Sequence, residues 1–315
     1  MPPRPGCEPA RRDIAADINA RIIEHLERGV LPWKQPWSGA GDGGAAGLPL
    51  RSNGAPYRGV NIVLLWMAAA ARGFRASRWY SFRQAVALGA HVRKGETGER
   101  VVYYGRIPRT RTDTRGETVE DAVRFLRAYV VFNADQIEGL APDDGETPST
   151  VETPASLADH EAWFSTLEIA RILHPDRAFY SPARDVIAMP PLAAFDSPDL
   201  YAQTLNHECV HAAGASHRAG RDFSGRYGPD AYAVEEICAE LGAAYLGAHL
   251  GLPPGHIHDH SAYIGHWIAA LKNDRRAFLE AAAKAQAAVD WLLAKSGRAC
   301  IAPPDAEGET LVVSP

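Results

Sequence analysis

Apolar residues recur at helical spacing near the start of the chain. Between Ile14 and Leu26 they stand every fourth position, which predicts a helix from Asp13 to Gly29 with one buried face. In the residues that follow, glycines mark the ends of helices, and runs of β-branched or aromatic residues favour strands. We predict helices at 61–72 and 81–88, and pairing between a strand–turn–strand at 92–104 and a strand at 122–133. This first part is predicted to be α+β.

The second part of the chain is predicted to be mainly helical. Ser197 is a suitable N-cap, Pro198 fits a first helical turn, and Gly214 suits a left-handed stop, so one helix should run between them. A short strand ended by prolines is expected within 179–191. Further helices are predicted at 160–173, 231–250, 258–271 and 274–295.

Composition divides the chain into two domains. Residues 139–158 are acidic and rich in Pro, Ser and Thr, which is typical of a linker. We therefore predict domains at 13–138 and 159–297, with a disordered N-terminus at 1–12 and a loose tail at 298–315. The fold class is α+β, with an α+β domain followed by a mainly helical one.

Charge separates along the same division. Residues 1–133 hold 21 Lys and Arg against 12 Asp and Glu, whereas the remainder holds 12 against 26. A basic first half suggests a polyanionic partner, although solvated arginine faces would give the same balance. The four cysteines form no CxxC pair, and neither a membrane span nor a signal peptide is apparent. A reduced, cytoplasmic protein without membrane contact is expected.

The residues with the clearest chemistry lie in the helix that begins after Ser197. His207 and His211 stand one turn apart, so both imidazoles can reach one metal ion. Glu208 follows the first histidine, where its carboxylate can take a proton from a water beside the metal. The sequence therefore predicts a metal site with His207 and His211 as ligands and Glu208 as the catalytic base.

A catalytic zinc site needs a third protein ligand, and two residues are candidates. His217 completes the spacing of metzincins, but no methionine follows it to form their Met-turn. Glu236 lies on the helix predicted at 231–250, amid apolar residues where a buried carboxylate needs a partner. Glu240, one turn later, could accept a hydrogen bond from the ring nitrogen that a ligating histidine does not use to bind the metal. We favour Glu236 and keep His217 as the alternative. Zn²⁺ is expected, and Mn²⁺ can substitute.

Basic and aromatic residues alternate in the predicted loops of the first domain. Single-strand binders stack bases on exposed rings while Arg and Lys follow the phosphates, although any one of these rings could instead belong to the core. No groove-reading helix or zinc finger is apparent, which disfavours duplex readout. The predicted nucleic-acid contacts are Trp33, Lys34, Trp37, Tyr57, Arg58, Arg78, Trp79, Tyr80, Arg93 and Lys94.

Short motifs are spread over both halves of the chain: Trp33-Lys34-Gln35-Pro36-Trp37, Ser52-Asn53-Gly54, Pro56-Tyr57-Arg58-Gly59, Val92-Arg93-Lys94-Gly95-Glu96, Phe132-Asn133, Met189-Pro190, the His207–His211 motif, Glu235-Glu236, Ala239-Glu240-Leu241 and Asp259-His260. Together these motifs resemble the ArdC family of plasmid antirestriction proteins. The resemblance covers about 13–138, which is similar to that family's single-stranded-DNA-binding domain, and about 160–295, which is similar to its zincin-like metallopeptidase domain. It implies a protein of mobile DNA that binds incoming single-stranded DNA and protects it from restriction.

Three functions are compatible with the sequence. The first is a DNA-tethered metallopeptidase of the gluzincin type that cleaves proteins on the DNA, with polypeptide entering along an exposed strand edge at 186–188 and Tyr263 or His260 stabilising the oxyanion. The second is a non-catalytic single-stranded-DNA-binding protector whose metal is structural. The third is a nuclease, which the motif disfavours because phosphodiester chemistry usually uses carboxylate-rich two-metal sites. An intact Glu208 favours the first.

Overall fold

The computed structural model describes residues 13–33, 47–112, 118–141, 156–223, 228–252 and 261–298. The predicted N-terminal tail, most of the linker and nearly all of the C-terminal tail lie outside these ranges. The fold mixes helices and sheets, as predicted from the hydrophobic pattern. None of the helices in the described ranges is long and apolar enough to cross a membrane.

The first part combines three helices with a four-stranded sheet. Asp13 caps the first helix by accepting from Ala16 N at 3.2 Å. A capping box between Ser81 and Gln84 starts the third helix. The helices are α1 (Ile14–Glu27), α2 (Val60–Arg72) and α3 (Phe82–Ala87), and the sheet has the order β1 (Leu50–Arg51), β2 (Arg78–Tyr80), β5 (Thr118–Asn133) and β4 (Glu99–Thr112).

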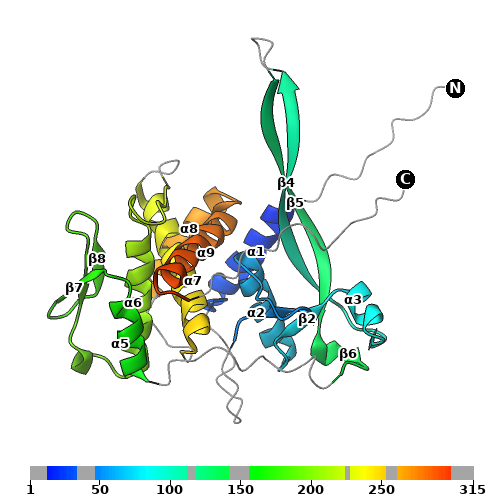
Figure 1. Ribbon diagram of the computed structural model, residues 1–315, viewed down its shortest axis with the longest axis horizontal. Helices are drawn as coiled ribbons and strands as arrows, with labels where there is room; N and C mark the ends of the chain where they lie inside the picture. Colours follow the sequence, from blue (N-terminus) through cyan, green and yellow to red (C-terminus); the bar gives the residue numbers. More distant parts are fainter. Residues whose placement is uncertain are drawn as a thin grey trace.

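Strands β4 and β5 form a long antiparallel ribbon that projects from the body of the molecule (Figure 1). Their register pairs Glu99 with Val131 and Thr112 with Thr118. The predicted partnership of 122–133 with the strand around Val101 is thus confirmed. The preceding strand is separate: β3 (His91–Val92) pairs with β6 (Ile137–Glu138), which follows the 3₁₀ turn η1 (Ala134–Gln136).

The second part packs helices against a three-stranded sheet. The helix predicted at 160–173 is wrong beyond Ser165, because Glu168 adopts a positive φ of 55° and residues 170–173 form a strand. The sheet has the order β7 (Ala170–Leu173), β9 (Val186–Met189) and β8 (Phe179–Ser181). The remaining elements are α5 (Leu157–Ser165), η2 (Leu192–Ala194), α6 (Pro198–Ala213), α7 (Gly228–Leu250), α8 (Ser261–Asn273) and α9 (Ala277–Lys295).

The two parts share one hydrophobic core. Buried residues from α1 and α2 join those of α6, α7, α8 and α9 in a continuous cluster, and Figure 1 places these helices side by side. Polar contacts cross the same boundary. Asn19 donates to the Leu271 carbonyl at 2.6 Å, and Tyr245 donates to the Gly59 carbonyl at 2.9 Å. The first half is therefore packed tightly against the helices of the second.

Candidate metal centre

Helices α6 and α7 supply the candidate site together. Ser197 caps α6 and Pro198 occupies its first turn, as predicted, but Gly214 at its end has φ −71° and is not left-handed. Gly242 of α7 lies against α6, and a Cβ there would stand 2.7 Å from both γ carbons of Val210. Glycine is needed at this position because the valine is fully buried and stiff. The close approach brings the acidic face of α7 onto the histidines of α6.

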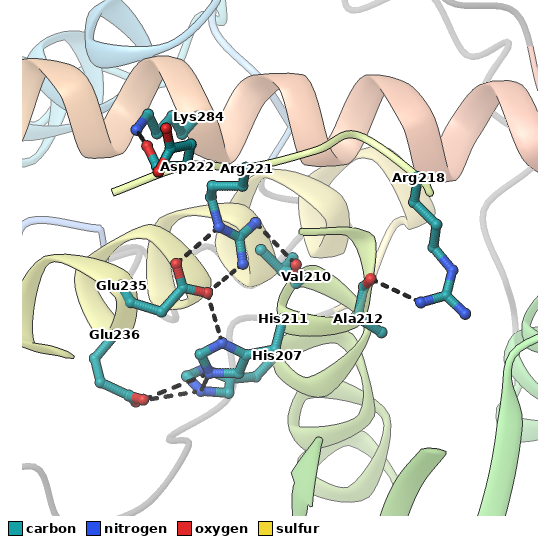
Figure 2. A network of polar contacts seen from close by, with 10 residues as sticks. All are labelled: His207, Val210, His211, Ala212, Arg218, Arg221, Asp222, Glu235, Glu236 and Lys284. Carbon is teal, nitrogen blue, oxygen red and sulfur yellow. Dashed lines mark hydrogen bonds and ion pairs between the residues drawn. The ribbon is translucent and has the colours of Figure 1, made fainter. Parts of the chain in front are cut away.

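His207, His211 and Glu236 converge on one point (Figure 2). The two Nε2 atoms lie 3.1 Å apart, and the Glu236 carboxylate lies 3.6 Å from each of them. One donor atom from each residue falls within 4.8 Å of the others. Two imidazoles and one carboxylate are a donor set that can hold a divalent metal ion.

Glu235 holds His211 from the opposite side. Its Oε1 lies 2.9 Å from His211 Nδ1, while Arg221 Nε donates to Oε2 at 2.8 Å and a second guanidinium nitrogen bonds Oε1 (Figure 2). The same guanidinium donates to the Val210 carbonyl of α6 at 3.0 Å. Burial raises the pKa of Glu235, but bonding to His211 and Arg221 outweighs it and lowers the pKa to about 2. The carboxylate therefore stays ionised and fixes the ring of His211.

Sequence reasoning missed this arrangement. Glu235 stands beside the predicted ligand Glu236, and its own role depends on which way the helix faces. Arg221 lies in a loop without periodicity, and its contacts depend on the packing of α6 against α7.

Glu240 lies behind His207, at the place predicted for it. Its Oε1 is 3.1 Å from His207 Nδ1, although the alignment falls short of a hydrogen bond. Burial lowers the pKa of His207, but the carboxylates of Glu236 and Glu240 outweigh it and raise that pKa well above its ordinary value. With each Nδ1 facing a carboxylate, both Nε2 atoms remain for a cation, so the residues present fit a divalent metal. Metal binding must compete with the proton on His207.

His217 does not join this cluster. Its side chain is 59% exposed, and its Nε2 lies 3.2 Å from Asp185 Oδ2. Asp185 is also held by Arg218 through two hydrogen bonds, at 2.7 and 2.9 Å. The geometry therefore favours Glu236 over His217 as the third ligand.

A cavity of about 810 Å³ opens beside the cluster. Glu208 lies in its wall, 6% exposed, next to the ligands but outside their cluster. Tyr232 from α7 and Tyr263 from α8 border it on the helical side. His260, the other residue predicted to stabilise an oxyanion, lies outside the described residues. The cavity leaves room for a substrate at the open side of the site.

The predicted strand edge at 186–188 is wrong. These residues belong to β9, which is fully buried and lies between β7 and β8. The periodicity could not reveal this, because a central strand and a half-buried edge strand are both short apolar runs. Strand β8 stands at the edge of the sheet instead, and Phe179 and Tyr180 line the cavity.

Most of the rings predicted to stack on bases are core residues. Trp33, Tyr57, Trp79 and Tyr80 are at most 3% exposed, so the expectation of exposed rings is wrong for all four. Trp33 packs against Trp267 of α8 and Phe278 of α9, which come much later in the chain. Lys34 and Trp37 lie outside the described residues.

The basic residues of the same prediction differ in exposure. Arg58 forms an ion pair with Asp290 of α9, and Arg78 is half-buried. Arg93 and Lys94 are exposed, and Arg93 donates to Glu96 at 2.8 Å.

An aromatic and basic group that the sequence did not single out lies on the β4–β5 ribbon, where Tyr103 and Arg127 are exposed and Phe125 is half-buried. Tyr103 is 43% exposed, and its ring centroid is 6.1 Å from that of Phe125. The guanidinium of exposed Arg127 lies 4.9 Å from the Phe125 centroid. Cross-strand pairing of Tyr103 with Arg127 produces this group, and such pairing depends on the register.

Two family models match the chain. The N-terminal domain of anti-restriction factor ArdC matches residues 12–132, and a zincin-like metallopeptidase matches residues 158–284. Fold and site thus define an antirestriction-type protein with a zincin-like metallopeptidase domain.

Relatives cover nearly the whole chain. An uncharacterised protein y4eC of Sinorhizobium fredii (strain NBRC 101917 / NGR234) is 39% identical over 91% of this chain and 94% of its own length. Antirestriction protein ArdC from plasmid R388 is 38% identical, and its metal-free structure covers 91% of this chain and 98% of that chain with a TM-score of 0.76. The Mn(II)-bound structure of the same protein matches with a TM-score of 0.72 and covers 90% of this chain and 98% of the R388 chain. The chain belongs to the ArdC family.

The family also occurs within a larger protein. DNA primase TraC of Escherichia coli is 37% identical over 90% of this chain, which spans 27% of the primase.

Metal content of single variants tests the ligand set. His211→Ala and Glu236→Ala should each lose a bound zinc ion, because each removes one of the three converging donors. His217→Ala is the control and should keep the wild-type stoichiometry, since that imidazole pairs with Asp185. Elemental analysis after dialysis gives the answer. Full metal in Glu236→Ala, together with loss in His217→Ala, would reverse the assignment.

Proposed function

We propose that this protein binds single-stranded DNA during antirestriction and carries a metal-dependent peptidase that cleaves proteins on that DNA. The observation that carries the peptidase half is the convergence of His207, His211 and Glu236 beside a cavity that Glu208 also lines. A purely structural zinc site usually has four protein ligands and no open position.

Zinc is the metal we assign to this site. Two imidazoles and one carboxylate suit zinc, and they also accept manganese, the metal bound in the second structure of the R388 protein. A bound ion would act as a Lewis acid that polarises the scissile carbonyl and lowers the pKa of the attacking water.

Glu208 then serves as the general base. It takes a proton from the attacking water, whose oxygen bonds to the carbonyl carbon of the peptide. When the carbon–nitrogen bond breaks, Glu208 passes that proton to the leaving amine. Its place next to His207 in α6, outside the ligand cluster, suits this role because a ligand could not also carry the proton.

Tyr232 and Tyr263 are candidates for stabilising the oxyanion. Both line the cavity from helices other than α6. Burial, together with the nearby Glu236 and Tyr263, raises the pKa of Tyr232 above its ordinary value, so its hydroxyl keeps the proton that it would donate.

Strand β8 is the element along which we expect polypeptide to lie. Within the described part of the chain it pairs only with β9, and Phe179 and Tyr180 border the cavity. An extended chain can add to such an edge through backbone hydrogen bonds, while the neighbouring side chains select its residues.

The DNA-binding half rests on charge and on the aromatic rings of the ribbon, of which Tyr103 is exposed and Phe125 is half-buried. The first 133 residues carry an excess of Lys and Arg, including exposed Arg93 and Lys94. We assign base stacking to Tyr103 and Phe125 of the ribbon, with Arg127 beside them. DNA held there would bring its attached proteins to the peptidase of the same molecule.

The alternative is a protector that coats DNA and uses its metal only for stability. It would need neither the open position nor a carboxylate beside it, and the cavity at Glu208 is the feature that favours catalysis.

Glu208→Gln separates these two functions. The variant should keep metal and DNA binding but lose cleavage of a protein bound to single-stranded DNA, because glutamine cannot accept the proton. Glu24→Gln, at an exposed position of α1, should cleave like wild type. Gel analysis with and without single-stranded DNA measures cleavage, and survival of incoming DNA under restriction measures protection. Cleavage by Glu208→Gln at the wild-type rate would refute the peptidase mechanism.

Tyr103→Ala tests the ribbon. It should weaken binding of a single-stranded oligonucleotide by about 1–3 kcal/mol, the usual contribution of one stacked base. Tyr104→Ala is the matched control, because the next residue of a strand faces the opposite side, and it should bind like wild type. Fluorescence anisotropy at several salt concentrations measures both, and the affinity should fall steeply as salt rises. Equal losses in the two variants, or an affinity insensitive to salt, would contradict the assignment.

A further inference from the structure

Trp33 belongs to the first half of the chain but lies among helices of the second. It follows α1 and is 2% exposed. Its ring centroid stands 5.7 Å from that of Trp267 in α8 and 6.0 Å from that of Phe278 in α9. Trp267 also lines the cavity of the metal centre. The N-terminal half therefore inserts a ring next to the site.

The polar end of this ring reaches the carboxylate behind a candidate ligand. Trp33 Nε1 donates to Glu240 Oε2 at 3.4 Å. Glu240 is 3% exposed, and its Oε1 lies 3.1 Å from His207 Nδ1. This hydrogen bond thus links the first half of the chain directly to the carboxylate that faces His207.

The chemistry of these groups gives the contact a consequence. An indole N–H can only donate a hydrogen bond, and the Glu240 carboxylate accepts it. A carboxylate behind a ligating histidine fixes the tautomer and the orientation of its ring, and losing such a partner typically lowers metal affinity about 10- to 100-fold. The orientation of the carboxylate depends in turn on the groups that donate hydrogen bonds to it, and Trp33 Nε1 is one of these donors to Glu240. Removing the indole N–H should therefore loosen Glu240 and, through it, His207.

We propose that Trp33 is a positioning residue of the metal centre, which acts through Glu240 on His207 and makes metal affinity depend on the docked N-terminal half. The inference rests on the metal site of the proposed function. Failure of the wild type to bind zinc would refute that site, whereas normal zinc binding by a Trp33 variant would refute the inference alone.

Trp33→Phe in the full-length chain is the test. Phenylalanine keeps an aromatic ring in the core but removes the donor. Trp66→Phe is the matched control, because Trp66 is 1% exposed, donates to the Gly47 carbonyl at the same 3.4 Å, and packs against Tyr245 of α7. Titration with zinc against a chromophoric chelator gives the affinity, and thermal unfolding of the metal-free variants compares their stability.

The expected result is zinc binding about tenfold weaker or more in Trp33→Phe. Trp66→Phe should bind zinc like wild type, although its loss of thermal stability should be similar to that of Trp33→Phe. The combination with Glu240→Gln should be no weaker than Glu240→Gln alone, because residues that act through one another are not additive. The visible spectrum of the cobalt-loaded Trp33→Phe protein should also differ from that of the control. Equal affinities in Trp33→Phe and Trp66→Phe, or additive losses in the double variant, would overturn the proposal.

Discussion

The close packing of α6 against α7 is the contact on which the candidate site depends. Gly242 allows the approach, since any side chain there would meet Val210. At this separation the imidazoles of His207 and His211 face the Glu236 carboxylate at equal distances of 3.6 Å. Burying three such groups together without a cation would be unfavourable unless protons balanced the carboxylates, and the raised pKa of His207 reflects that balance. A divalent cation bound among these groups would supply the positive charge that balances the carboxylates.

The same packing links the site to the rest of the chain. Arg221 joins the loop after α6 to both helices, and Glu235 passes that constraint to His211. On the other side, Glu240 stands between His207 and the first half of the chain. Each histidine therefore has a carboxylate facing its Nδ1 atom. The shared core explains how residues distant in sequence can set the geometry of one metal centre.

Local signals in the sequence were sufficient for the helix that carries the motif. Ser197, Pro198 and the one-turn spacing of His207 and His211 are features of a single helix, and they are found as predicted. Glu236 could be inferred because a carboxylate amid apolar residues needs a partner. Glu235 and Arg221 could not, since their roles arise only when two helices meet.

Other features were not local. Trp33 stands between Pro32 and Pro36 in a segment predicted to be a loop, and such a segment can still bury a ring under helices that come more than 200 residues later. Strand β9 is central rather than at an edge, and its partners β7 and β8 are set by tertiary pairing that a local pattern does not contain. The aromatic and basic group on the ribbon likewise depends on the register of β4 against β5.

We propose an open metal site whose protein ligands are the two imidazoles and one carboxylate that converge in the structure. X-ray absorption spectroscopy of the full-length chain loaded with one equivalent of zinc tests it most directly. Two imidazole nitrogens are expected at about 2.0–2.1 Å from the zinc ion, with the remaining shell made of oxygen from one carboxylate and solvent. A shell with three imidazoles, or one closed by four protein ligands, would contradict it.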